Sequence, residues 1–180
     1  SQLQPFAKRF QTVTKLGSWH DYVVFDIRND DARHRSIVLR DKTGNHRILY
    51  AQSGFSTVSE LRLPSFVNVE GNRLLVYRAQ IGGNGHFYIE YYFLFDPESH
   101  LPKSLSLDPI DMELKEILPE ERAVWKGGGF DIATLTYKHA VWKKGDGNCC
   151  PSAGSVWMKL TIRDKELVVT ESHYDPDKRL

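Results

Sequence analysis

Residues 86–95 alternate apolar and more polar side chains without a break, and this pattern limits the possible folds more than any other stretch. One face of an extended strand would carry Phe87, Ile89, Tyr91, Phe93 and Phe95. The other face would carry His86, Tyr88, Glu90, Tyr92 and Leu94. A period of two over this length indicates a β-strand. We expect the first face to be buried.

The same alternation returns near the carboxyl end of the chain. One face of a second predicted strand carries Val156, Met158, Leu160 and Ile162. A polar turn at 163–166 then leads into another strand-like run. Shorter apolar runs separated by turn residues cover 22–27, 36–40, 47–50, 67–70, 73–80 and 131–144. This spacing predicts hairpins and a meander of antiparallel strands.

Two segments have helical rather than strand-like spacing. Residues 1–18 carry Phe6, Phe10, Val13 and Leu16, which would share one face of a short amphipathic helix. A second helix is expected from Asp108, with Asp108 as its N-cap and Pro109 in its first turn. The candidate runs through Val124, but Pro119 would stop or kink it, and the helix would then end near Leu118.

These patterns predict a mostly β or α+β fold. We expect an antiparallel sheet or a sandwich of hairpins, with one or two covering helices, in a single domain over residues 1–180. The 180 residues are enough for one full hydrophobic core, and 41% of them are apolar. A net charge of +1 gives no electrostatic reason to expect a nucleic-acid partner. No apolar run is long enough for a transmembrane helix.

The two cysteines of the chain, Cys149 and Cys150, are adjacent. Neighbouring cysteines can form a vicinal disulfide only by closing a small, strained ring. The alternatives are two thiols in a turn or a bond to another chain. A catalytic cysteine would need a base, for which His139 and His173 are the candidates. We predict the vicinal bridge.

Other chemistry is less well marked by the sequence. The acidic turn with Asp26, Asn29, Asp30 and Asp31 has carboxylates that Ca²⁺ prefers, but Arg28 stands where the second oxygen ligand should be. The spacings typical of zinc sites do not occur. We therefore expect no metal and no cofactor. Glu90, Asp131 and Glu171 are candidate carboxylates for glycoside hydrolysis, although no spacing singles them out.

Aromatic side chains supply the remaining candidates for a binding surface. Tyr88 and Tyr92 lie on the less apolar face of the first alternating strand. Trp142 and Trp157 flank the cysteine pair in sequence. Aromatic rings present both an apolar surface and a polar edge, which suits carbohydrate- or protein-facing surfaces. The predicted binding residues are Tyr88, Tyr92, Trp142, Cys149, Cys150 and Trp157.

The segment Asp146-Gly147-Asn148-Cys149-Cys150-Pro151-Ser152, followed by a strand and a polar turn, resembles the Asp-x-x-Cys-Cys-Pro-Ser segment of uncharacterised exported bacterial proteins. The run from Phe25 to Asp31 is faintly similar to the aspartate-rich turn of FG-GAP/VCBS-type repeat proteins. The resemblance implies a β-rich fold and a periplasmic or secreted location at the bacterial envelope. It carries no known activity.

The sequence identifies no reaction. We therefore expect a non-enzymatic exported binding module that contacts a protein or a cell-envelope polymer. An inhibitor or immunity-type protein is one form that such a module could take. The alternative is a hydrolase that acts on a cell-envelope substrate with carboxylate or His/Asp chemistry. A cluster of titratable side chains in a deep pocket would favour the hydrolase, and an aromatic patch without one would favour binding.

Overall fold

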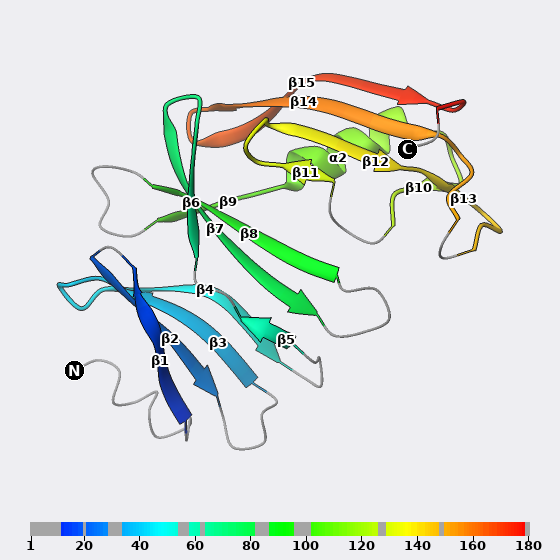
Figure 1. The fold of residues 1–180 in the computed structure, drawn as a ribbon. Helices are drawn as coiled ribbons and strands as arrows, with labels where there is room; N and C mark the ends of the chain where they lie inside the picture. Colours follow the sequence, from blue (N-terminus) through cyan, green and yellow to red (C-terminus); the bar gives the residue numbers. More distant parts are fainter. Residues whose placement is uncertain are drawn as a thin grey trace. The chain divides into compact units, whose positions relative to one another are not determined.

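Antiparallel β-strands dominate the computed structural model of the chain, as the alternating patterns predict (Figure 1). The structure describes residues 12–19, 21–28, 34–53, 58–61, 64–81, 87–95, 102–125, 129–147 and 150–178. The strands are β1 (Thr12–Trp19), β2 (Tyr22–Arg28), β3 (His34–Arg40), β4 (His46–Ser53), β5 (Val58–Leu61), β6 (Ser65–Val69), β7 (Asn72–Ile81), β8 (Phe87–Phe95), β9 (Lys103–Leu105), β10 (Arg122–Ala123), β11 (Phe130–Asp131), β12 (Thr136–Ala140), β13 (Trp142–Lys143), β14 (Ser155–Arg163) and β15 (Glu166–Asp175). Helix α2 spans Asp108–Ile117.

The chain forms two compact units. Unit 1 comprises residues 1–66 and 75–103, and unit 2 comprises 67–74 and 104–180. The prediction of one domain over residues 1–180 stays a prediction, because compact units of this kind occur both within and between domains. Among the described residues, no helix is long and apolar enough to cross a membrane.

Unit 1 contains an antiparallel meander in the order β1-β2-β3-β4. Strands β7 and β8 are neighbours in a second sheet, in the order β5-β7-β8-β9 with β6 also paired to β7. Residues from both sheets form one buried cluster of Val24, Ile37, Leu39, Leu49, Leu75, Tyr77 and Phe93. Because apolar faces of the two sheets meet in this cluster, unit 1 is a sandwich around a shared core.

The helix predicted over residues 1–18 is wrong for the part that the structure describes. Residues Thr12–Trp19 form β1 and pair with β2, while 1–11 lie outside the described residues. Val13 is 53% exposed, whereas Leu16 packs against the core, so they do not share one buried stripe. Thr14 lies opposite the buried Asp26, and because side chains alternate along a strand, Leu16 shares its core-facing side while Val13 does not. The β-branched Thr12, Val13 and Thr14 also favour the strand.

The central part of β8 is buried on both of its faces. Phe93 is buried as predicted, but Tyr92 and Leu94 on the opposite face are buried as well. Tyr91 is partly buried, and the side chains of Phe87 and Ile89 lie outside the described residues. The sequence alternation therefore identifies the strand correctly, but it overstates the difference between the two faces.

A buried carboxylate lies on the core-facing side of the meander. Asp26 is 1% exposed, and its oxygens accept hydrogen bonds from Arg28 at 2.8 and 2.6 Å and from Arg35 at 2.9 and 2.8 Å. Burial by itself would raise the pKa of Asp26. The hydrogen bonds and charges of Arg35 and Arg28 outweigh burial and lower that pKa. Asp26 is therefore a structural ion-pair residue of unit 1.

Asp26→Asn should destabilise the protein by about 3 kcal/mol at pH 7, the low end for a broken buried pair because Arg28 is half exposed. Since the folded-state pKa is lowered, this stabilisation is present above about pH 4 and is lost as pH falls through the folded pKa. Urea unfolding at pH 7 and pH 2 should show the difference between variant and parent shrinking in acid. The control is Asp21→Asn, at an exposed aspartate of the same unit. An equal loss of unfolding free energy at pH 7 and pH 2 would contradict the role of Asp26 as an ion-pair residue.

Unit 2 contains a four-stranded antiparallel sheet in the order β11-β12-β14-β15. One face of this sheet carries Val156, Met158 and Leu160, which are buried as predicted, while Ile162 is partly buried. The β14–β15 hairpin closes at Asp164 and Lys165, both with positive φ. This conformation matches the twist of the flanking strands and confirms the polar turn predicted at 163–166. A short ribbon of β10 and β13 completes the described strands of the unit.

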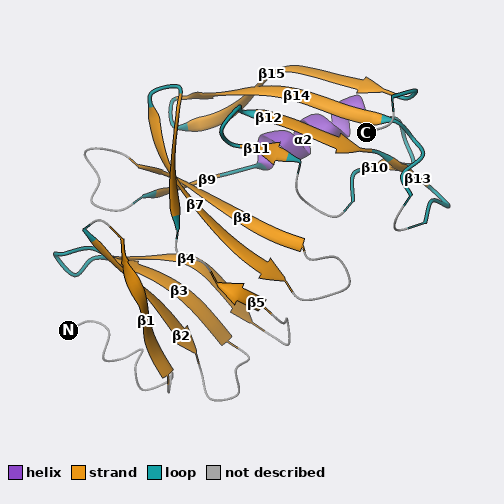
Figure 2. Cartoon of the chain, viewed as in Figure 1, coloured by secondary structure: helices purple, strands orange, loops and turns teal. Residues whose placement is uncertain are grey.

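Helix α2 packs against β15 in unit 2 (Figure 2). Ile110 is its buried residue, and Glu113 accepts a hydrogen bond from the hydroxyl of Ser172 on β15. The helix ends at Ile117 because Leu118, which precedes Pro119, is extended, as predicted. Its start differs from the prediction. The residue before the helix is Leu107, and the backbone N–H of Asp108 donates to the hydroxyl of Ser106.

The tip of the β6–β7 hairpin, residues 67–74, belongs to unit 2. Glu70 and Gly71 both have positive φ, so the chain reverses there in a tight turn. The Glu70 carboxylate accepts hydrogen bonds from the Thr161 hydroxyl at 2.7 Å and the Ile162 N–H at 3.2 Å. These bonds tie the hairpin tip to β14.

Candidate functional site

The six predicted binding residues are divided between the two units. Tyr88 and Tyr92 lie on β8 of unit 1, although the side chain of Tyr88 is outside the described residues. Tyr92 is 3% exposed, and its hydroxyl donates to Glu90, which also pairs with Arg78. Tyr92 therefore contributes to the interior rather than to a surface. The remaining predicted residues are in unit 2.

Asp146 organises the loop that carries the cysteine pair. Its carboxylate accepts hydrogen bonds from the backbone N–H of Lys143 at 2.9 Å and from the N–H and hydroxyl of Ser152 at 2.9 and 2.6 Å. The Ser152 hydroxyl is the main reason that the pKa of Asp146 is lowered, with the N–H of Lys143 next. The first and last residues of the Asp-x-x-Cys-Cys-Pro-Ser segment are thus hydrogen-bonded to each other.

Trp142 supports the same loop from inside unit 2. It is 7% exposed, and its indole N–H donates to the carbonyl of Gly147 at 3.3 Å. The His139 ring lies against it, with ring centroids 5.7 Å apart. The carbonyl of Gly147 also accepts the N–H of Cys150 at 3.0 Å. Trp142 therefore shapes the loop but offers little ring surface to a ligand.

The Asp146 bonds predict a local effect. Asp146→Ala should speed hydrogen exchange of the Lys143 and Ser152 amides, because each loses its carboxylate acceptor. Asp146→Asn should have a smaller effect, since one side-chain oxygen remains. The matched control is Asp131→Ala, which removes a comparable turn bond to the Ala133 N–H elsewhere in the unit. NMR-detected exchange at pH 7 measures this. Unchanged exchange at both amides would rule out the loop-closing role.

Cys150 is exposed at the outer part of this loop, while Asn148 and Cys149 lie outside the described residues. The vicinal bridge stays a prediction, and so does a binding role for either cysteine. Bridging removes two hydrogens, so intact-mass analysis should show a gain of about 2 Da on reduction. The ring closed by adjacent residues is minimal. The double variant Cys149→Ser/Cys150→Ser should therefore lose well under 2 kcal/mol, the low end for ordinary disulfides. A mass that does not change on reduction would refute the bridge. A loss of stability of about 2 kcal/mol or more in the double variant would refute its small effect on stability.

Trp157 lies on the sheet face opposite to Val156 and Met158. It pairs with Lys138 of β12 on one side and with His173 of β15 on the other. In antiparallel sheets, directly opposite residues project from the same face. Lys138 and His173 are exposed and Trp157 is partly exposed, so this row is open to solvent.

A shallow pocket of about 410 Å³ opens over this row. Its lining residues are Lys138, Ser155, Val156, Trp157, His173, Asp175 and Lys178, and we refer to it as the Trp157 pocket. Asp175 accepts the N–H groups of Asp177 and Lys178 at 3.0 and 3.1 Å through one carboxylate oxygen. This turn holds Lys178 beside the row.

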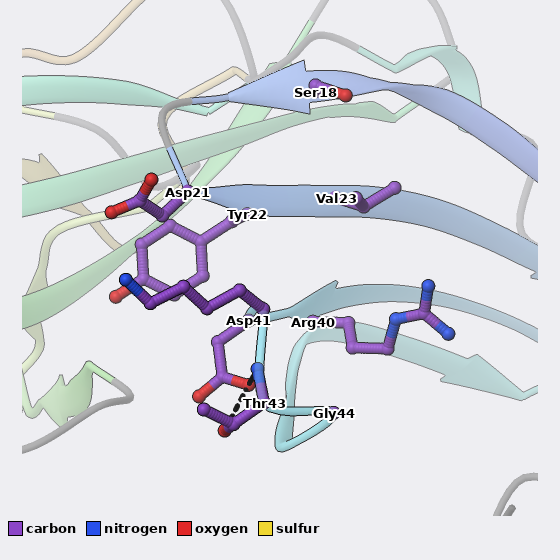
Figure 3. Close-up of a pocket in the computed structure, with 9 residues that line it drawn as sticks. Ser18, Asp21, Tyr22, Val23, Arg40, Asp41, Thr43 and Gly44 are labelled. Carbon is purple, nitrogen blue, oxygen red and sulfur yellow. Dashed lines mark hydrogen bonds between the residues drawn. The ribbon is translucent and has the colours of Figure 1, made fainter.

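A second shallow pocket, of about 420 Å³, lies in unit 1 (Figure 3). It borders Asp41, which accepts hydrogen bonds from Thr43 at 2.9 and 2.8 Å and from Asn45 at 2.9 and 3.1 Å. Burial would raise the pKa of Asp41, but these bonds outweigh it and lower the pKa. The Arg40 side chain extends away from Asp41, and its guanidinium lies 4.9 Å from the centre of the Phe25 ring. The groups at this pocket therefore stabilise a turn.

The residues that the structure describes contain no group of three or more His, Cys, Asp or Glu side chains placed to hold a metal ion. Of the acidic turn considered for Ca²⁺, only Asp26 is described, and two arginines engage its carboxylate. Comparisons with family models, curated proteins and solved structures give no match to the chain. The assignment of a function therefore depends on the site itself.

Sequence reasoning identified Trp157 but missed Lys138, Asp175 and Lys178. Lys138 lies on the polar side of an alternating run, between the buried Tyr137 and the partly buried His139. That alternation was available in the sequence. The pairing of Lys138 with Trp157 was not, because it requires the register between strands that are separated along the chain.

Proposed function

We propose that the chain is an exported, non-enzymatic binding module and that its ligand is a polymer of the cell envelope. The observation that carries the proposal is the Trp157 pocket. Its aromatic ring lies in the middle of a strand row, between an exposed lysine and an exposed histidine. The resemblance of the Asp146–Ser152 segment to exported bacterial proteins supports the location.

The form of this pocket suits retention of a ligand. Ligand sites typically combine an apolar surface with a few polar groups that fix orientation. Trp157 supplies the apolar surface, while Lys138, His173 and Lys178 supply donors at its edge. The fold holds these groups on paired strands and a hydrogen-bonded turn, so little ordering is needed on binding.

One observation favours the alternative, an envelope hydrolase, because His173 and Asp175 border the same pocket. General acid–base catalysis needs a group positioned on the reacting proton. One oxygen of Asp175 is already engaged by the backbone of Asp177 and Lys178, which is the role of a turn residue. A binding role therefore accounts for this carboxylate better. Release of soluble sugar from the polymer by the parent, lost in His173→Ala, would favour the hydrolase.

Trp157→Ala should reduce binding to an insoluble polysaccharide fraction of bacterial cell walls by about tenfold or more, as for a central aromatic contact. Cosedimentation at a series of protein concentrations measures this. The matched control is Trp125→Ala, because Trp125 is 48% exposed, belongs to unit 2 and does not line the pocket. Circular dichroism should show that both variants are folded. Equal sedimentation of parent and Trp157→Ala would contradict the proposal.

A further inference from the structure

We infer that the Trp157 pocket recognises a sugar residue that bears a carboxylate. This inference rests on the proposed function and specifies the ligand class for the same site. It depends on three properties of the pocket: the single aromatic platform, the lysines at its edge, and its size.

The first property is that one aromatic ring, that of Trp157, lies among mostly polar lining residues, with Val156 as the other apolar residue. Lys138 and His173 occupy the flanking positions of the row, and Ser155 and Asp175 lie farther along the same face. A sugar ring has an apolar face of C–H groups that can lie on an aromatic ring, and its hydroxyls point outward to polar neighbours. A protein partner would want more apolar surface around the ring. The exposed large hydrophobic residues among those described are Val13, Ile48, Met112 and Trp125, and none lines this pocket.

The second property is the excess of positive charge. Two lysines, Lys138 and Lys178, border the pocket against one carboxylate, Asp175. The next charged pair on this face, Lys159 and Glu171, lies 3.7 Å apart and is internally balanced. The Asp175 carboxylate is also partly occupied by two backbone N–H groups. The unbalanced charge of the lysines is therefore available to an anionic group of the ligand.

The third property is the volume of about 410 Å³, which falls in the range of small-molecule sites. Such a pocket holds roughly one or two sugar rings of a longer polymer. Lys138 is the direct cross-strand neighbour of Trp157, and Lys178 lines the same pocket. A carboxylate attached to the ring stacked on Trp157 can therefore approach them while the ring stays in contact with the indole.

The test uses the full chain and two soluble probes, an oligomer of a hexuronic acid and the neutral oligomer of the matching hexose. NMR should show that the acidic oligomer shifts the indole N–H of Trp157, and calorimetry should show that it binds more tightly than the neutral one. Lys138→Gln and Lys178→Gln should each weaken acidic binding by about threefold, as expected for exposed charges. Added salt should weaken it further. Lys115→Gln, an exposed lysine on α2, should change nothing.

Each other outcome overturns the inference in a distinguishable way. Equal binding of the two oligomers, insensitive to the lysine variants and to salt, would leave the proposed function in place but remove the acidic specificity. Failure of both oligomers to shift the Trp157 indole, with wall binding still lost in Trp157→Ala, would show that the ligand class is wrong. Wall binding retained in Trp157→Ala would overturn both proposals together.

Discussion

Hydrogen bonds between β14 and its two neighbours fix the central row of the Trp157 pocket. They place Lys138, Trp157 and His173 in one row, and the same pairing places Val156 and Met158 on the opposite face. Because side chains alternate along a strand, a slip of one residue would turn Trp157 inward and expose Met158. Burial of Val156, Met158 and Leu160 opposes that slip. The apolar core therefore determines which face carries Trp157 and the other groups of the proposed binding site.

Bonds at both ends of β14 reinforce this register. At one end, the positive φ values of Asp164 and Lys165 allow a tight turn into β15. At the other, the Asp146 carboxylate joins Lys143 to Ser152 just before the strand begins. The Glu70 carboxylate holds the backbone N–H of Ile162 near the hairpin end. These polar contacts lie at the ends of the strand, so they position it without enlarging the core.

The sequence predicts the parts of the fold that depend on neighbouring residues. Alternation identifies β8 and β14, and Pro119 locates the end of α2, because both signals act within a few residues. The N-terminal helix was predicted wrongly because the spacing of Val13 and Leu16 fits a helix, whereas pairing with β2 places both residues on a strand, on opposite faces. Pairing with strands that are distant along the chain selects strand over helix in such segments, and the local spacing of apolar residues does not reveal that pairing.

The same limit applies to the candidate site. Aromatic content indicated both Trp142 and Trp157, which the sequence could not distinguish. The structure separates them by burial, because Trp142 donates to Gly147 inside the unit whereas Trp157 lines an open pocket. Lys178 reaches the pocket through a turn at Asp175, which local sequence only suggests.

Within unit 2, the face that holds the core is separate from the face that carries the proposed binding site. The inner face of the sheet packs against α2 and carries the buried side chains, while Lys138 and Lys159 on the outer face are exposed. Substitutions at exposed positions away from caps and networks usually alter stability by about 0.5 kcal/mol or less. The outer face can therefore vary its charges while the register of β14 is preserved. If the outer face binds a ligand as proposed, such a sheet would keep one fold while its ligand changes.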